Sequence, residues 1–243
     1  MPRPRREDFP GAWHHVMNRG AGRGSIFTSE ADRSLFLNCL TEASEQTDLE
    51  VHGYCLLGNH YHLLLLSRAG RLSDGMKHLA GKFTRLFNLR HNRDGPLFRS
   101  RFASVPIRTD AHLVQVSRYI HLNPVVAKLA EEPEDWPWSS AAAYLGHSCG
   151  PRWLRTTTIL AMFGAPIGVP RTRPFSALAS MPRRLNSMPG WNEGVRPGGS
   201  DTLERVIDSV LAVFVLKHRG QTLAATLRPP PRTARCARCP APA

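Results

Sequence analysis

Hydrophobic residues in the first 150 positions follow two periods, one typical of strands and one of helices. Short apolar segments of strand length occur at residues 12–18, 51–57, 60–66 and 97–107. The second and third segments are separated by the turn residues 58–59, Gly-Asn, which is a two-residue hairpin signal. These patterns predict four strands, two of them joined as a hairpin.

Helical spacing of apolar residues predicts helices between these strands and after the last one. Ser29 and Ser73 are favourable capping residues for the first two helices. The third helix is expected to run from Asp110 to Leu122, because Pro124 disfavours helix at the residue before it. The resulting order, β-α-β-β-α-β-α, predicts an α+β fold with a ferredoxin-like antiparallel sheet and helices packed on one face.

The pattern weakens in the C-terminal third, which suggests a division into three parts. We expect a folded domain at residues 1–147 and a linker with a short helical piece at 148–200. Residues 201–243 begin as an amphipathic helix and end in a Pro/Arg-rich segment of disordered composition. Cys236 and Cys239 lie in that segment as a lone CxxC, for which a zinc site is poorly supported without a second ligand pair.

The charge balance narrows the class of partner. The 243 residues include 32 Lys and Arg against 19 Asp and Glu, a net charge of +13. This excess favours a polyanion, either nucleic acid or an anionic membrane surface. No apolar run approaches the ~18 residues of a membrane span, and the charged N-terminus has no apolar core after it. We therefore expect a cytoplasmic protein that binds nucleic acid.

His60 and His62 open one of the predicted strands. Side chains two positions apart on a strand point to the same face, so both imidazoles lie side by side. Neutral imidazoles are common ligands of divalent metals. Alternatively, the two histidines only form hydrogen bonds with their neighbours.

Tyr119 and Asn123 are four residues apart and share one face of the predicted third helix. A tyrosine hydroxyl is a possible nucleophile towards phosphorus, and an amide oxygen suits a hard divalent ion. Alternatively, Tyr119 packs in the core and Asn123 caps the end of the helix. These residues alone do not decide between the two readings.

Residues 77–108 are strongly basic, with eight Lys and Arg against Asp94 alone, a composition suited to a groove that contacts phosphates. His14, Asn18 and Arg19 are weaker candidates for DNA contact, and His14 is equally suited to a structural role. From the basic stretch, the candidates for DNA binding are Lys82, Arg85, Arg93, Arg99 and Arg101.

Several motifs in series resemble the REP-associated tyrosine transposases, which belong to the HUH single-stranded DNA transposases of the insertion-sequence-200 type. They cover about residues 10–146 and imply the ferredoxin-like fold that the strand and helix order predicts. The matching stretches are Trp13–Gly20, Tyr54–Leu65, Phe87–Arg90, Gly95–Phe98, Arg118–Val125 and Trp138–Ser140.

By this resemblance, His60 and His62 bind Mg²⁺ or Mn²⁺, Asn123 is the third metal ligand and Tyr119 is the nucleophile. The implied activity is that of a transposase that attacks single-stranded or hairpin DNA and forms a 5′-phosphotyrosine. A monomer and a homodimer both remain open.

Two other functions stay open at this stage. One is a domesticated protein that binds DNA hairpins without cleaving them, which needs the basic groove but not Tyr119. The other is a duplex-binding transcription factor that works through the C-terminal helices, which leaves His60 and His62 unexplained.

Overall fold

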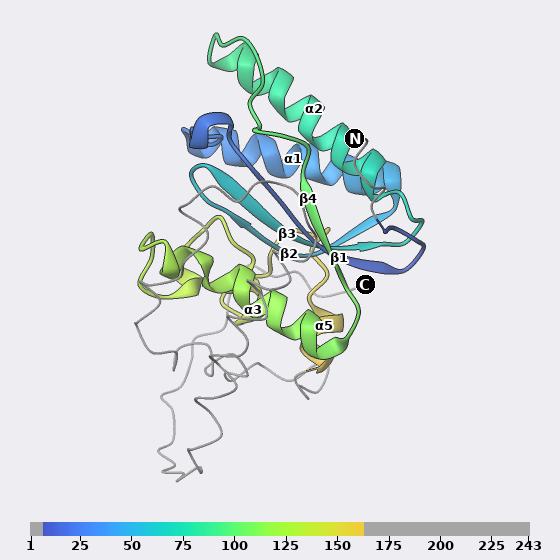
Figure 1. Ribbon diagram of the computed structural model, residues 1–243. Coiled ribbons are helices and arrows are strands. Elements are labelled where there is room, and N and C mark those ends of the chain that lie inside the picture. Colours follow the sequence, from blue (N-terminus) through green and yellow to red (C-terminus); the bar gives the residue numbers. More distant parts are fainter. Residues whose placement is uncertain (1–6, 163–243) are drawn as a thin grey trace. The chain divides into compact units, whose positions relative to one another are not determined.

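A computed structural model describes residues 7–162, whose centre is a four-stranded antiparallel sheet (Figure 1). The spatial order is β2-β3-β1-β4, with β2 and β4 at the edges. This is the order of a ferredoxin-like sheet, and the predicted α+β class is confirmed. The strands are β1 (Ala12–Arg19), β2 (Leu49–Leu56), β3 (His60–Ser67) and β4 (Ala103–Ile107).

Three long helices accompany the sheet, together with several short ones. No helix of the described part of the chain is long and apolar enough to span a membrane. The long helices are α1 (Glu30–Thr47), α2 (Leu72–Arg90) and α3 (Asp110–Val126). The short ones are η1 (Ala21–Arg23), η2 (Pro133–Asp135), α4 (Ala141–Tyr144) and α5 (Thr157–Met162).

The helices cover both faces of the sheet, which differs from the single covered face that we expected. Leu63 and Leu65 of β3 pack into the cluster formed with α1 and α2, whereas Leu64 packs with α3. Figure 1 shows the sheet between α1 and α2 on one side and α3 on the other. Because side chains alternate along a strand, a continuous run of leucines is apolar on both faces and must be covered on both.

The ends of the helices depend partly on distant residues. Ser29 caps α1 as expected, accepting a hydrogen bond from the Asp32 amide at 3.2 Å. The expected cap of α2 at Ser73 is wrong, because the helix already begins at Leu72 and the Leu72 amide donates to Asp8 Oδ2 at 2.8 Å. A carboxylate far away in the sequence therefore takes the role that we assigned to a local serine.

Two other predicted boundaries also shift. Only residues 103–107 of the expected strand 97–107 form β4, and Phe98 makes an isolated bridge to Gly20. Helix α3 continues past Asn123 to Val126 with Pro124 inside it. The buried ring of Pro124 thus lies in the last turn, where the helix is about to end.

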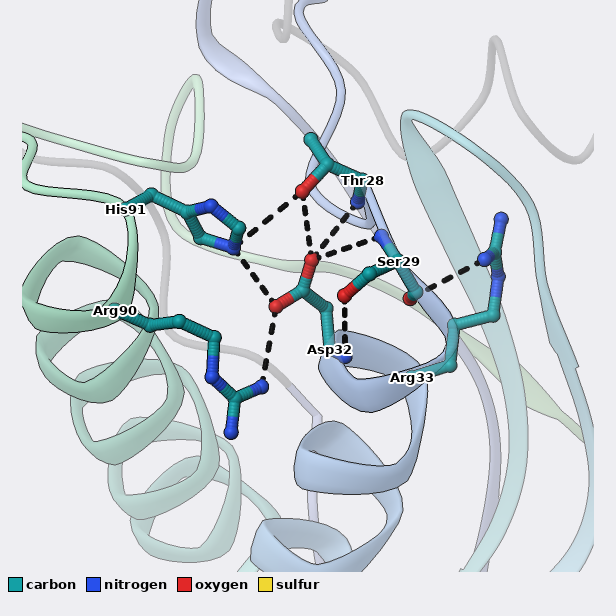
Figure 2. A network of polar contacts seen from close by, with 6 residues as sticks. All are labelled: Thr28, Ser29, Asp32, Arg33, Arg90 and His91. Atoms are coloured by element: carbon teal, nitrogen blue, oxygen red, sulfur yellow. Dashed lines mark hydrogen bonds and ion pairs between the residues drawn. The ribbon is translucent and has the colours of Figure 1, made fainter.

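A buried carboxylate, Asp32, joins the start of α1 to the end of α2 (Figure 2). Its Oδ1 accepts hydrogen bonds from His91 at 2.8 Å and from Arg90 at 3.3 Å. Its Oδ2 accepts from the backbone amides of Thr28 and Ser29, each at 3.0 Å. These hydrogen bonds hold the pKa of Asp32 far below its usual value, although burial acts in the opposite direction.

The packed part of the chain extends beyond the predicted boundary at residue 147. Leu154 forms a bridge with Val51 of β2, and Ile159 and Leu160 of α5 are buried against α3 and the sheet. The predicted helix and tail at 201–243, and the linker beyond Met162, lie outside the described residues.

Candidate active site

The sheet face covered by α3 brings together the residues with the strongest predicted chemistry. In the pairing of β1 with β3, Arg19 lies opposite His60 and Met17 lies opposite His62. The ring centroids of His60 and His62 are 5.2 Å apart. Tyr119, from α3, places its ring 5.5 Å from that of His62. Sheet and helix thus gather two imidazoles and a phenol at one site.

A third histidine, His15 of β1, was not among our predicted site residues. Its Nε2 lies 3.0 Å from Nδ1 of His62, and its ring centroid lies 5.7 Å from that of Tyr119. The sequence signal was the pair His14-His15, because two neighbouring residues on a strand must face opposite sides. Which of the two shares a face with His62 depends on the register between β1 and β3.

The imidazoles are suited to bind a divalent cation. Nδ1 of His60 lies 2.7 Å from Oδ1 of Asn59 and must donate its proton there, which puts the lone pair of the neutral ring on Nε2. Burial and the charge of Arg19 lower the pKa of His60 to about 4, and burial holds the pKa of His62 well below its ordinary value. Both rings are therefore neutral at physiological pH, as metal ligands must be.

A third protein ligand must differ chemically from the first two. Within residues 7–162, His, Cys, Asp and Glu form no group of three or more that could hold a metal ion. The side chain of Asn123 lies one turn beyond Tyr119 on α3, and its Nδ2 donates to the Tyr119 carbonyl at 2.8 Å. Its amide oxygen is a donor of the kind that Mg²⁺ or Mn²⁺ accepts. Two imidazoles and one amide are chemically compatible with such an ion, and the role of Asn123 as third ligand stays a prediction.

The hydroxyl of Tyr119 is protonated at neutral pH. Burial raises its pKa to about 12, against a hydrogen bond from the Asn123 side chain and the positive charge of Arg19, which both lower it. Any attack by this oxygen therefore has to release a proton during the reaction.

Positive charge gathers at the same end of the sheet. Burial and the like charges of Arg23 and Arg99 lower the pKa of the Arg19 guanidinium. The backbone ties two of them together, because the Arg99 amide donates to the Arg19 carbonyl at 2.9 Å. A guanidinium group that feels the charges of two others is suited to an anion with several oxygens, such as a phosphodiester.

Other predicted DNA contacts lie on the opposite face of the sheet. His14 and Asn18 pair with residues of β3 that point towards α1 and α2. His14 is fully buried between Asp8 and Ser104, at 3.3 and 3.1 Å, which argues against the predicted DNA contact. Asn18 is also buried and donates to the Ser100 carbonyl at 3.2 Å.

The basic residues of α2 are likewise remote from Tyr119, because α2 packs on the face opposite α3. Lys82 forms an ion pair with Glu42 of α1, and Arg85 is exposed. Arg93, just after α2, lies over the ring of Phe87. Arg99 and Arg101 are exposed, and of the predicted basic residues only Arg19 and Arg99 have contacts that place them beside the site.

Comparisons with known proteins find a matching family and a solved structure of similar fold. Residues 9–123 match the family described as "Transposase IS200 like". Among solved structures, a REP-associated tyrosine transposase bound to a REP hairpin matches with a TM-score of 0.52 and 18% identity, over 64% of this chain and 92% of that one. This likeness supports the same fold.

Another solved structure, a protein from Deinococcus radiodurans described as a candidate transposase, gives a TM-score of 0.36 at 18% identity. It covers 49% of this chain and 95% of that one. No curated protein matches the chain.

Proposed function

Residues 9–123 belong to the IS200-like transposase family, and from this premise we propose that the protein cleaves and rejoins single-stranded DNA through a covalent phosphotyrosine. The observation that carries the proposal is the meeting of Tyr119 with His60 and His62 on one face of the sheet. A nucleophile beside two neutral imidazoles is an arrangement for metal-assisted attack on a phosphodiester.

Each group at the site has a separate role. Arg19 and Arg99 bind the oxygens of the scissile phosphate and its neighbour, and the face of the sheet keeps the strand in line with Tyr119. His60, His62 and Asn123 would hold Mg²⁺ or Mn²⁺. When bound, such an ion neutralises charge on the phosphate oxygens and so makes the phosphorus more electrophilic.

In the first step the Tyr119 oxygen attacks phosphorus, and the bond from phosphorus to the 3′-oxygen breaks. The phenolic proton leaves during the attack, and the departing 3′-oxygen takes up a proton, so the DNA ends as a 3′-hydroxyl and a 5′-phosphotyrosine. In the second step a 3′-hydroxyl attacks the phosphotyrosine and releases Tyr119. The covalent link retains the energy of the phosphodiester bond, so no nucleoside triphosphate is needed.

We propose that the substrate is single-stranded DNA that folds into a hairpin. One solved structure of similar fold is a REP-associated tyrosine transposase bound to a REP hairpin, and the net charge of +13 in this chain favours a polyanion. A hairpin offers both a duplex stem for the basic surface and an unpaired strand that can reach the half-buried phenol of Tyr119.

The test is incubation of labelled hairpin DNA with the protein and Mn²⁺, followed by denaturing electrophoresis. Tyr119→Phe is expected to form no covalent adduct. Tyr61→Phe is the matched control, because Tyr61 lies between the two histidines in sequence but packs against Phe36 on the other face of the sheet. An adduct that survives Tyr119→Phe would refute the assignment of the nucleophile.

Metal dependence separates cleavage from binding. His60→Ala is expected to abolish cleavage while most of the affinity for the hairpin remains, because phosphate contacts dominate affinity. Binding by the unmodified protein without any adduct in Mg²⁺ or Mn²⁺ would instead indicate the alternative, a hairpin-binding protein that does not cleave.

A further inference from the structure

His15 and His62 form a buried pair of imidazoles behind the candidate metal site. Their nitrogens, Nε2 of His15 and Nδ1 of His62, lie 3.0 Å apart, and their ring planes are inclined by only 29°. Both side chains are 1% exposed. Water therefore does not compete for this hydrogen bond, and its direction is decided within the protein.

The direction of this hydrogen bond decides whether His62 can bind a metal. A neutral imidazole carries its proton on one ring nitrogen and an available lone pair on the other. If His15 donates from Nε2, then Nδ1 of His62 holds a lone pair and the proton of His62 lies on Nε2, where it blocks a metal. If His62 donates from Nδ1, its Nε2 is the nitrogen with the lone pair.

We propose that His15 is a positioning residue that accepts the proton of His62 Nδ1 and thereby fixes His62 in the tautomer and orientation that bind a divalent cation through Nε2. The inference rests on the proposed metal site. His60 has the equivalent support from a different kind of group, the side-chain oxygen of Asn59 at 2.7 Å. The two proposed metal ligands, His60 and His62, thus each have an acceptor for the proton on Nδ1.

The position of His15 suits a partner of His62. Its ring centroid lies 5.2 Å from that of His62 and 5.7 Å from that of Tyr119. When Nε2 of a neutral His15 accepts, the ring proton of His15 lies on Nδ1, which has no hydrogen-bond partner among the described residues. A cation on Nε2 of His62 requires this arrangement, because the ring proton of His62 must then lie on Nδ1.

The test measures Mn²⁺ affinity of the full chain by titration, with free Mn²⁺ followed by electron paramagnetic resonance. His15→Phe removes the acceptor but keeps a ring, and is expected to weaken Mn²⁺ binding about 10- to 100-fold. His15→Gln places an amide oxygen near the position of Nε2 and is expected to restore most of the affinity. Mn²⁺ affinity unchanged in His15→Phe would overturn the proposal.

His14→Phe is the matched control for the loss of a buried imidazole from β1. His14 is the neighbour of His15 and is fully buried, but it faces the opposite side of the sheet. The control is expected to keep the Mn²⁺ affinity of the unmodified protein, whatever its effect on thermal stability. An equal loss of affinity in His14→Phe and His15→Phe would reduce the role of His15 to packing and overturn the proposal.

Failure of this inference can be distinguished from failure of the metal site itself. His62→Ala should remove Mn²⁺ binding if the site is correct. If His62→Ala binds Mn²⁺ normally, the proposed function fails. If His62→Ala loses the metal while His15→Phe keeps it, only the role of His15 fails.

A measurement on the unmodified protein avoids any doubt about variants that fold poorly. In nitrogen-15 spectra of the Mg²⁺-loaded protein, the ring proton of His62 is expected on Nδ1, with a coupling across the hydrogen bond to Nε2 of His15. A ring proton found on Nε2 of His62, or on Nε2 of His15, would contradict the proposal.

Discussion

Single residues decide the chemistry of this site through the face of the sheet on which they lie. Tyr61 is fully buried among the aromatic rings of the α1 and α2 side, and burial raises its pKa. Tyr119 lies beside the histidines instead. The two tyrosines are thus both protonated at neutral pH, and only their positions in the fold distinguish them.

The same distinction of faces divides the arginines and gives a prediction for DNA binding. Arg99 is exposed and adjoins Arg19 at the site, whereas Arg85 is exposed on α2. Arg99→Gln should weaken binding of a labelled single strand and reduce the slope of log affinity against log salt by about 0.7, as loss of one phosphate contact requires. Arg85→Gln should leave both quantities within error. Equal effects of the two substitutions would mean that DNA binding extends over α2.

At the scale of elements, Asp32 links the N-terminal end of α1 to the C-terminal end of α2, on the face of the sheet away from the site (Figure 2). The carboxylate combines a helix cap with charge-assisted hydrogen bonds to the end of α2. Since a buried charge without partners is costly, the contribution of this residue exceeds that of an ordinary cap.

Asp32→Asn is expected to lower the free energy of unfolding by about 2–4 kcal/mol, because it removes the charge that Arg90 and His91 compensate. Urea denaturation at pH 7 measures the change. Glu30→Gln, in the same first turn but exposed, is the control and should cost less than about 0.5 kcal/mol. A similar small loss for both variants would show that the network contributes little.

At the scale of the whole molecule, buried neutral imidazoles make the fold sensitive to acid. His15 and His121 are each 1% exposed, and burial lowers the pKa of both to about 3. In the unfolded chain they have the ordinary pKa of about 6.5, so the unfolded state takes up protons first as the pH falls. The contribution of these two histidines to the free energy of unfolding is complete above pH 6.5 and is lost progressively as the pH falls to about 3.

At pH 5, each of these two histidines is expected to have lowered the free energy of unfolding by about 2 kcal/mol relative to neutral pH. Thermal or urea unfolding measured from pH 7.5 to 4.5 should therefore show a steady loss of stability that starts near pH 6.5. The pKa of Asp32 is also lowered, but its unfolded value is near 3.8, so its contribution is lost only at more acidic pH. Stability that stays constant from pH 7 to 5 would contradict the burial of neutral histidines.

The extent of the packed domain gives a prediction about truncation. A chain that ends at residue 162 keeps Ile159 and Leu160, whereas one that ends at residue 147 loses both buried side chains. The shorter chain should be less stable by about 3–6 kcal/mol, at ~1.5–3 kcal/mol for each buried side chain. Denaturation of both proteins under reducing conditions measures the difference. Equal stability would place the boundary at 147, as the sequence pattern predicts.

The sequence by itself determined those features that depend on local order along the chain. Period-two and helical spacing located the four strands and three long helices, and the spacing of His60 and His62 placed them on one face of a strand. The predictions that were wrong also came from local order along the chain. The expected cap at Ser73 and the full strand at 97–107 were local readings that contacts from Asp8 and Gly20 replaced.

Only the tertiary structure decided which faces meet. Strand periodicity shows that His14 and His15 point to opposite sides, but the register of β1 against β3 decides that His15 is the one behind His62. In the same way, the run of leucines in β3 requires cover on both faces, and the packing of α3 on the histidine face brings Tyr119 to the site. Register and packing involve residues far apart in the chain, and no local pattern encodes them.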